Sequence, residues 1–358
     1  MRHSHSDYMQ WAKLHSKARY NLATSGVGAF PLRELGVTID QLEINGDSAY
    51  GYAPLQEAIA AKCEVAPDCV VATAGTSMAN HLAMAALIET GDEVLIEHPA
   101  YELIVSTASY FGATVKRFPR REEDGYALDP QSIRRAITPK TKLIIVTNLH
   151  NPSSVLTPDS VLLEVGNLAR SVGASVLVDE VYLDAAYENT PRSSFHLGPE
   201  FVVTNSLTKV YGLSGLRCGW ILAQPDLADR MWRLNDLFAS IPAHPAELLS
   251  VIALQRLDKI RQCARQVVEA DRKLLGKFLD EQADKSLSAV RTPFGTTTFV
   301  GLKKGNADEF LTQLRAQQDT SAVPGRFFDM PNHIRIGMGV NTELFAEGLR
   351  RISTALCR

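Results

Sequence analysis

The stretch from residue 206 to 220 reads SLTKVYGLSGLRCGW. It places Lys209 directly after an apolar run, with hydroxyl groups at Ser206 and Thr208 and a guanidinium at Arg217. Ligands bind at the carboxyl ends of strands in parallel sheets. A lysine in a dry environment there has a lowered pKa, which suits an amine that attacks a carbonyl, and the hydroxyls and the arginine can hold a phosphate. Taken alone, a surface loop with a solvated lysine is the alternative.

Short apolar runs occur on both sides of this stretch and alternate with amphipathic helical patterns from about residue 55 onward. This alternation is typical of repeated βα units around a mostly parallel sheet whose strands are buried on both faces. The expected strands are 70–73, 93–98, 114–119, 142–148, 175–182, 201–206 and 218–223. One helix is expected at 77–90, where Gly91 provides a C-terminal stop. The sequence therefore predicts an α/β fold with a mostly parallel seven-stranded sheet flanked by helices.

The pattern changes after about residue 245. A long charged helical stretch, 248–282, leads to alternating strands at 296–302 and 333–338. The first 40 or so residues have no strong strand and could pack against this C-terminal part, giving a smaller α+β domain formed by both chain ends. The expected bounds are 45–250 for a large domain, 251–274 for a connecting helix, and 1–44 plus 275–358 for the small domain.

Composition limits the classes of partner. The chain of 358 residues has 37 basic and 40 acidic residues and a net charge of −3, so it lacks the footprint of a nucleic-acid or anionic-membrane binder. It has no apolar run suited to a signal peptide or a membrane span, and we expect a cytoplasmic location. Its five cysteines form no CxxC pair, so we expect reduced thiols and no metal site. A small-molecule partner is the better expectation.

Two more polar stretches follow expected strands. In SVLVDEVY (175–182), Asp179 ends an apolar run, and a buried aspartate is costly unless it meets a cation. A helix cap or a surface ion pair is the alternative. In TNLHNPSS (147–154), the Asn151 amide could donate to a phenolate oxygen of a cofactor, although Asn-Pro is also an ordinary turn signal.

In order and spacing, NLHNPSS, DEVY and SLTKVYGLSGLRCGW resemble the signature of fold-type I aminotransferases of class I/II, from about Tyr50 to Arg335. The resemblance implies the cofactor pyridoxal 5'-phosphate (PLP), a homodimer, and amino transfer between an α-amino acid and a 2-oxo acid. Lys209 resembles the lysine that holds PLP as a Schiff base and then moves the substrate proton. Asp179 resembles the partner of the pyridine nitrogen.

The remaining site residues are carried over on the same basis. Asn151 and Tyr182 resemble the two donors to the ring oxygen of the cofactor. The phosphate ligands implied are Gly75, Thr76, Ser77, Ser206, Thr208 and Arg217. The first three lie at a strand-to-helix turn suited to a phosphate, where an ordinary helix cap is the compatible alternative. Tyr101 matches the aromatic residue that stacks on the ring, though alone it would be read as a core residue.

Near the C-terminus, HIRIGMG (333–339) places Arg335 in an alternating strand. A lone arginine there would usually face solvent, but the resemblance implies that it binds the substrate α-carboxylate, with Asn151 also contacting the substrate. In AYGYAPLQEAIA (49–60), Tyr50 or Tyr52 resembles the tyrosine that reaches the phosphate of the neighbouring subunit, and both fit.

The chain departs from the family pattern in two places. Ser153 and Ser154 replace the usual Thr-Gly, which removes a glycine that tolerates positive φ. The opening YNLATSGVGAF resembles a divergent branch that includes cyclising enzymes of amino-acid antibiotic synthesis.

The reaction therefore has alternatives. A PLP-dependent decarboxylase, β-lyase or cyclase would use the same site. A non-catalytic effector module is less favoured because no basic helix-turn-helix precedes the fold. A dinucleotide oxidoreductase is disfavoured because no GxGxxG follows an early strand. The identity of the amino donor stays open.

Overall fold

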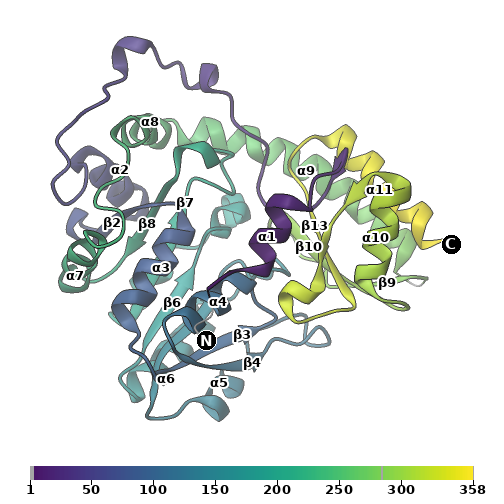
Figure 1. The fold of residues 1–358 in the computed structure, drawn as a ribbon, viewed down its shortest axis with the longest axis horizontal. Coiled ribbons are helices and arrows are strands. Elements are labelled where there is room, and N and C mark those ends of the chain that lie inside the picture. Colours follow the sequence, from purple (N-terminus) through teal and green to yellow (C-terminus); the bar gives the residue numbers. More distant parts are fainter. Residues whose placement is uncertain (1–3, 284, 358) are drawn as a thin grey trace.

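The seven expected apolar runs form one sheet in the computed structural model, which describes residues 4–283 and 285–357 (Figure 1). In spatial order the strands are β2 (Val70–Ala74), β8 (Cys218–Leu222), β7 (Phe201–Ser206), β6 (Ser175–Asp179), β5 (Thr141–Thr147), β3 (Glu93–His98) and β4 (Thr114–Pro119). Neighbouring strands are parallel except where β8 pairs antiparallel with β2 and β7. The predicted α/β fold with a mostly parallel sheet is confirmed.

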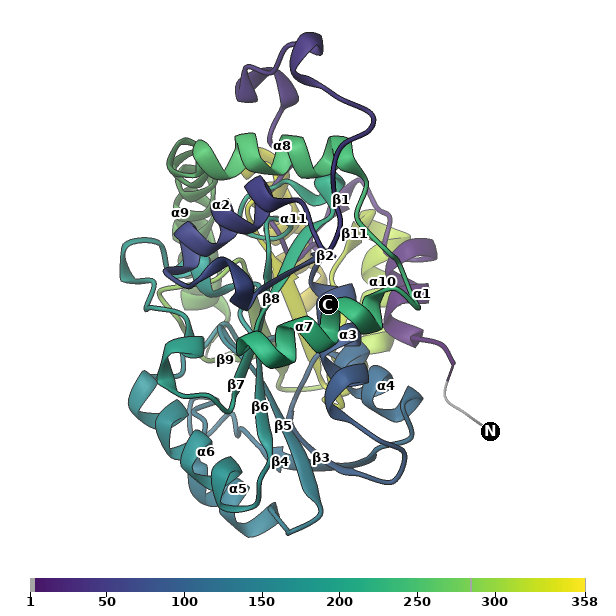
Figure 2. The same cartoon turned by 90° about the vertical axis from the view of Figure 1, so that its left-hand side faces the viewer.

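Helices cover both faces of this sheet. They are α2 (Ala53–Cys63), α3 (Thr76–Leu87), α4 (Glu102–Tyr110), α5 (Pro130–Ala136), α6 (Asp159–Ser171) and α7 (Pro225–Asn235). Figure 2 shows α3 and α4 on one side of the strands and α5 and α6 on the other. The central strands are therefore buried on both faces, which explains why their sequences are continuous apolar runs rather than alternating ones.

A smaller sheet forms beside the large one from the C-terminal part of the chain. Its antiparallel strands, in spatial order, are β12 (Val323–Pro324), β13 (His333–Gly337), β10 (Thr297–Leu302) and β9 (Leu287–Ala289). The helices of this part are α9 (Leu257–Gln282), α10 (Ala307–Gln318) and α11 (Thr342–Leu356).

The N-terminal residues join this smaller part, as expected. Strand β1 (Tyr20–Asn21) pairs in parallel with β11 (Thr320–Ser321), and helix α1 (Asp7–Leu14) precedes it. In Figure 1, α1 lies between the large sheet and the smaller one. Both chain ends thus contribute to the α+β part, while the exact domain bounds stay a prediction.

Two elements differ from the expected ones. The charged stretch 248–282 forms two helices, α8 (His244–Gln255) and α9, which meet at Arg256 with φ −119° and ψ 19°. The helix that leads to the smaller sheet is therefore α9, rather than residues 251–274. Strand β6 ends at Asp179 instead of continuing to 182, because the Asp179 carboxylate accepts a hydrogen bond from the Val181 amide and turns the backbone.

The strand ends gather the polar stretches at one edge of the large sheet. Gly75 follows β2, Asp179 ends β6, and Ser206 ends β7. Arg217 comes just before β8, and because β8 runs opposite to its neighbours, its first residue lies at the same edge. No described helix is long and apolar enough to cross a membrane.

Candidate active site

A cavity of about 270 Å3 lies at this edge of the large sheet, and we refer to it as the active-site cavity. It brings together most of the residues predicted from the sequence. Those that line it are Thr76, Ser77, Tyr101, Asn151, Asp179, Tyr182, Thr208, Lys209, Arg217 and Arg335. They come from six different segments of the chain, so only the fold can place them around one space.

Three predicted residues, and Tyr52 as the alternative to Tyr50, do not line this cavity. Gly75 lies directly behind it, against the Arg217 side chain. Ser206 is buried, and its hydroxyl accepts a hydrogen bond from the Thr208 amide at 3.2 Å, which shapes the turn into Lys209. Tyr50 is 51% exposed and donates to Asp236 at 3.3 Å, away from the cavity of its own chain.

The amino group of Lys209 points into the active-site cavity and donates a hydrogen bond to the Ser25 hydroxyl at 2.8 Å. Burial lowers the pKa of the Lys209 ammonium, and the charge of Arg335 acts in the same direction. A lowered pKa favours the neutral amine, which is the form that attacks a carbonyl or accepts a proton.

Asp179 is 4% exposed and lies at the floor of the cavity. Its carboxylate accepts hydrogen bonds from the Asn80 amide nitrogen at 2.8 Å and from the Val181 backbone at 3.0 Å. Asn80 is oriented in turn by the Thr204 hydroxyl at 2.6 Å. Burial raises the pKa of Asp179 to about 6, even though both hydrogen bonds lower it. This carboxylate lacks a nearby cation strong enough to offset its burial.

The start of α3 forms one end of the cavity. Gly75 precedes the helix with φ +82°, a conformation that favours glycine, and it lies against the end of the Arg217 side chain. Arg217 donates to the Ala74 carbonyl at 2.9 Å. The hydroxyls of Thr76 and Thr208 are buried and have no hydrogen-bond partner within the described chain. Free helix amides, an arginine and two unused hydroxyls make this end suitable for a phosphate.

Arg335 lies at the opposite side and is 1% exposed, so it points inward from β13 rather than to solvent. Its guanidinium donates to Asn151 Oδ1 at 3.0 Å and to the Tyr8 hydroxyl at 2.9 Å, and its Nε has no partner. Across residues 4–283 and 285–357 it forms no ion pair with a carboxylate. A buried cation without an anion is costly, so this arrangement favours an anionic ligand.

Asn151 is held by a buried network behind it. Its backbone amide donates to the Thr147 hydroxyl at 2.9 Å, and Thr147 donates from its amide and its hydroxyl to Glu97 at 2.7 and 2.6 Å. Glu97 is paired with Arg120 at 2.9 Å, and both side chains are fully buried. This network fixes the loop after β5.

The same loop contains Ser153 and Ser154, which replace the usual Thr-Gly of the family pattern. Ser154 adopts φ +65°, the conformation that a glycine would take without strain. Its hydroxyl donates to the Thr297 carbonyl at 2.8 Å, a buried hydrogen bond that helps to hold this backbone. The left-handed turn is therefore kept without the glycine.

Several residues of the cavity were not predicted from the sequence. They are Tyr8, Met9, Ala12, Ser25, Asn80, Thr147 and Val181. Asn80 could have been found, because it lies four residues after Thr76 and so on the same face of α3. Tyr8 and Ser25 carry no local signal, since they come from the N-terminal segment and reach the site only through the tertiary fold.

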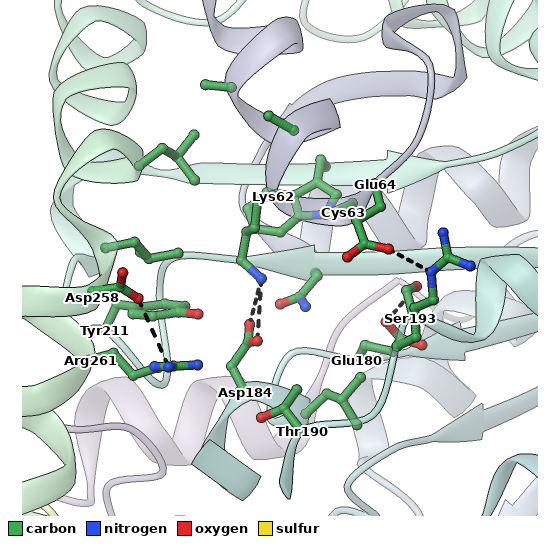
Figure 3. A pocket seen from close by; sticks show the side chains of 18 of the residues that line it. Lys62, Cys63, Glu64, Glu180, Asp184, Thr190, Ser193, Tyr211, Asp258 and Arg261 are labelled. Atoms are coloured by element: carbon green, nitrogen blue, oxygen red, sulfur yellow. Dashed lines mark hydrogen bonds and ion pairs between the residues drawn. The ribbon is translucent and has the colours of Figure 1, made fainter. Parts of the chain in front are cut away.

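A second and larger cavity, of about 1050 Å3, lies behind the same strand ends (Figure 3). Glu180 and Tyr211 line it, although their neighbours Asp179 and Lys209 line the active-site cavity. Its buried charges have protein partners: Lys62 pairs with Asp184 at 3.1 Å. Glu180 accepts hydrogen bonds at 2.6 to 2.8 Å from two consecutive serines, 193 and 194. These two sets of buried charges are therefore satisfied by contacts within the protein.

Comparison with known proteins identifies the family. Residues 41–352 match the family described as aminotransferase class I and II. The chain belongs to this family. A capreomycidine synthase from Streptomyces vinaceus is 28% identical over 95% of this chain and 90% of its own length. A probable aspartate/prephenate aminotransferase from Thermus aquaticus is 27% identical over 86% of this chain and 82% of its own. The crystal structure of a PLP-dependent aminotransferase from Streptococcus suis 89-1591 superposes with a TM-score of 0.93, at 26% identity, over 100% of this chain and 99% of that one.

The enzyme is therefore a fold-type I member of the family, and its cofactor is PLP. The cavity fits this cofactor. Lys209 offers an amine of lowered pKa for the aldehyde, Asp179 offers a buried carboxylate that forms no ion pair among the described residues, and Thr76 offers an unused hydroxyl for the phosphate.

The Asp179→Asn variant, free of cofactor, is expected to unfold at a higher temperature than the wild type at pH 8. The pKa of Asp179 is raised to about 6, so the folded chain binds this proton more tightly than the unfolded chain does. The resulting stability is present at low pH and is lost as the pH rises through 6. The difference between the variants is up to about 3 kcal/mol above pH 7 and fades toward pH 4. Thermal unfolding across this pH range measures it, and equal melting curves at all pH values would contradict the assigned pKa.

Proposed function

We propose that this enzyme is an aminotransferase that moves an amino group between an α-amino acid and a 2-oxo acid. The observation that carries the proposal is that the partly buried amine of Lys209 and the buried guanidinium of Arg335 line one cavity together with Asp179. An α-amino acid substrate requires an amine that exchanges the proton at its Cα and a cation that binds its carboxylate.

Lys209 would hold the cofactor, and its Nζ would accept and return the Cα proton of the substrate. Its lowered pKa favours the neutral form needed for this step. Asp179 would pair with the ring nitrogen and keep it protonated, and a cation at this place would offset the cost of burying the carboxylate. When bound, PLP supplies an electron-accepting ring that stabilises negative charge at the substrate Cα.

The other residues of the cavity hold and orient the cofactor. Asn151 and Tyr182 would donate hydrogen bonds to its ring oxygen, and Tyr101 would pack against the ring. Gly75, Thr76, Ser77, Thr208 and Arg217 would hold the phosphate, with Ser206 shaping the turn behind it. The Asn151 carbonyl oxygen accepts from Arg335, so its amide hydrogens stay available for the cofactor and the substrate.

Donors with uncharged side chains are expected to react faster than aspartate or glutamate. The cations that line the described cavity are Lys209, Arg217 and Arg335, and all three have roles in this proposal. Tyr8, Met9 and Ala12 of α1 also line the cavity, and we infer that they would face the substrate side chain, where a second carboxylate would be desolvated without a partner. We expect a preference of at least about tenfold in kcat/KM.

An absorbance experiment tests both the reaction and this preference. The protein with PLP is mixed with alanine, leucine, phenylalanine, aspartate or glutamate, without any acceptor. Conversion of the bound cofactor to its amine form, with release of the matching 2-oxo acid, supports aminotransfer. A cofactor band that no amino acid converts to this form contradicts it. Faster conversion by the two acidic donors would contradict only the side-chain preference.

A cyclase is the second candidate. The capreomycidine synthase covers 95% of the chain, compared with 86% for the probable aspartate/prephenate aminotransferase, so the likeness to the synthase extends over more of it. Consumption of an amino acid with no 2-oxo acid and no amine form of the cofactor would favour this reading. Release of CO2 or ammonia would instead favour a decarboxylase or a lyase.

We also propose a homodimer, in the cytoplasm. Segment 31–51 extends away from the rest of the chain in Figure 1 and exposes Ile39 and Ile44, which are 85% and 81% accessible. Tyr50 lies at the end of this segment, is exposed and does not line the cavity of its own chain, which supports a role for Tyr50 or Tyr52 at a second copy. Sedimentation of the purified protein measures the oligomeric state.

A further inference from the structure

The segment from residue 22 to 28, LATSGVG, joins the Lys209 loop to the smaller sheet, and we call it the bridging segment. On one side, the Val27 amide donates to the Lys209 carbonyl at 2.8 Å. On the other side, the Gly337 amide donates to the Leu22 carbonyl at 2.7 Å. The bridging segment therefore fixes the backbone around Lys209, although it lies outside the stretches 147–154 and 175–182 that carry the other site residues.

Ser25 sits in the middle of the bridging segment, with its hydroxyl against the Lys209 amino group. The distance from Lys209 Nζ to Ser25 Oγ is 2.8 Å, and the serine is buried. The Thr296 hydroxyl donates to the Ser25 carbonyl at 2.8 Å and fixes the backbone at this point. The next residue is Gly26, where a Cβ atom would lie 2.8 Å from the Lys209 carbonyl oxygen, so the close approach depends on glycine.

The same hydroxyl also contacts the Tyr182 phenol; burial raises the pKa of Tyr182, and this contact offsets part of the rise. A serine has one hydroxyl hydrogen and two acceptor lone pairs. If its hydrogen is directed to Tyr182, its lone pairs face Lys209. Within the described residues, this is also the one side-chain hydrogen bond of the Lys209 amino group.

We propose that Ser25 is a positioning residue for Lys209, whose hydroxyl accepts a hydrogen bond from the amino group and holds it ready to exchange the substrate proton. The inference rests on the proposed role of Lys209 in aminotransfer. When the Cα–H bond breaks, its electron pair stays with the substrate and its proton goes to neutral Nζ. The nitrogen then carries three hydrogens, and one of them donates a hydrogen bond to Ser25 Oγ. Later Nζ returns one proton to the substrate, so no other reactant is consumed.

Two variants separate the hydroxyl from the backbone that carries it. Ser25→Ala removes the acceptor, and Ser25→Thr keeps it. Thr296→Val is the matched control, because it removes a hydrogen bond to the Ser25 backbone but leaves the hydroxyl and the cavity unchanged.

The first measurement is the rate of cofactor conversion in a single turnover, with a donor that carries hydrogen or deuterium at Cα. Ser25→Ala is expected to slow conversion about tenfold, the effect of about 1.4 kcal/mol from one hydrogen bond to a charged group. The isotope effect rises because proton transfer is the step that slows. Ser25→Thr retains most of the rate, and Thr296→Val retains both the rate and the isotope effect.

The second measurement needs no turnover. The rate at which the cofactor-free protein captures PLP is followed against pH, and its midpoint reports the titration of the Lys209 amine. Loss of an acceptor disfavours the ammonium, so Ser25→Ala is expected to shift this midpoint down by about one unit. Thr296→Val leaves it in place.

Unchanged isotope effects and capture midpoints in Ser25→Ala would overturn the proposal. It would also be overturned if Thr296→Val reproduced the Ser25→Ala effects, because the backbone contact alone would then account for them. A wild-type protein that captures PLP but is converted by no amino acid would count against aminotransfer only, since the capture midpoint still tests the contact between Ser25 and Lys209.

Discussion

Replacing Lys209 with alanine is expected to abolish covalent attachment of PLP and to lower the rate of amino transfer by at least about 10³-fold. The cavity holds one amine at the end of β7, and burial favours its reactive neutral form. Without it, Asp179 and Arg217 can still hold the cofactor, but no group remains to take the Cα proton. Reduction with borohydride followed by mass spectrometry measures attachment, because it fixes the cofactor to the wild type and leaves the variant unmodified.

Two further variants test whether the effect of Lys209→Ala comes from the loss of this amine. Lys209→Arg keeps a positive charge at the same place but provides no nucleophile, so it is expected to fail in the same way as alanine. Lys259→Ala removes an exposed lysine that binds Glu34 on the surface and should behave as wild type. Reduction that still fixes PLP to Lys209→Ala would place the reactive lysine elsewhere in the chain.

The large sheet could be predicted from the sequence because its strands are buried on both faces. Each of the seven apolar runs forms a strand, with ends that differ by at most one residue apart from β6. That strand stops early because Asp179 bonds to the amide two residues on, a local competition between side chain and backbone that an apolar run does not reveal.

The break between α8 and α9 had no sequence signal. The nearest glycine, Gly276, lies inside α9 without breaking it, and no proline lies near Arg256. Amphipathic periodicity continues across the junction, and the chain changes direction through the backbone of one arginine. Such a turn is set by tertiary packing, which overrides the local helical preference.

Some residues of the active-site cavity could be predicted from the local sequence, and others reach it only through the tertiary fold. Residues at strand ends could be predicted because parallel strands deliver their carboxyl ends to one edge. Tyr8 and Ser25 could not, because α1 and the bridging segment reach the cavity only after the chain ends have met through β1 and β11. Arg335 depended on the resemblance, since its strand alternates and its inward direction follows from packing against Phe328 and Tyr8.

Replacing Arg335 with alanine is expected to lower kcat/KM for α-amino acids by about 100-fold or more. The guanidinium is buried, is held by Asn151 and Tyr8, and lacks a carboxylate partner, so the substrate α-carboxylate is its natural counter-ion. Most of the loss should appear in KM, because the ion pair is present both in the bound substrate and in the transition state. Arg335→Lys keeps the charge but loses the two-pronged geometry, and an intermediate loss is expected.

The decisive comparison uses an amine that lacks the α-carboxylate. Wild type should strongly prefer the amino acid over its decarboxylated analogue, and Arg335→Ala should lose most of that preference while retaining bound PLP. Arg326→Ala, on the neighbouring surface and paired with Asp308, is the matched control and should keep wild-type KM values. If Arg335→Ala lost stability but kept the preference, the guanidinium would be a packing element between Tyr8 and Phe328, and the carboxylate would have to be bound by another group of the cavity.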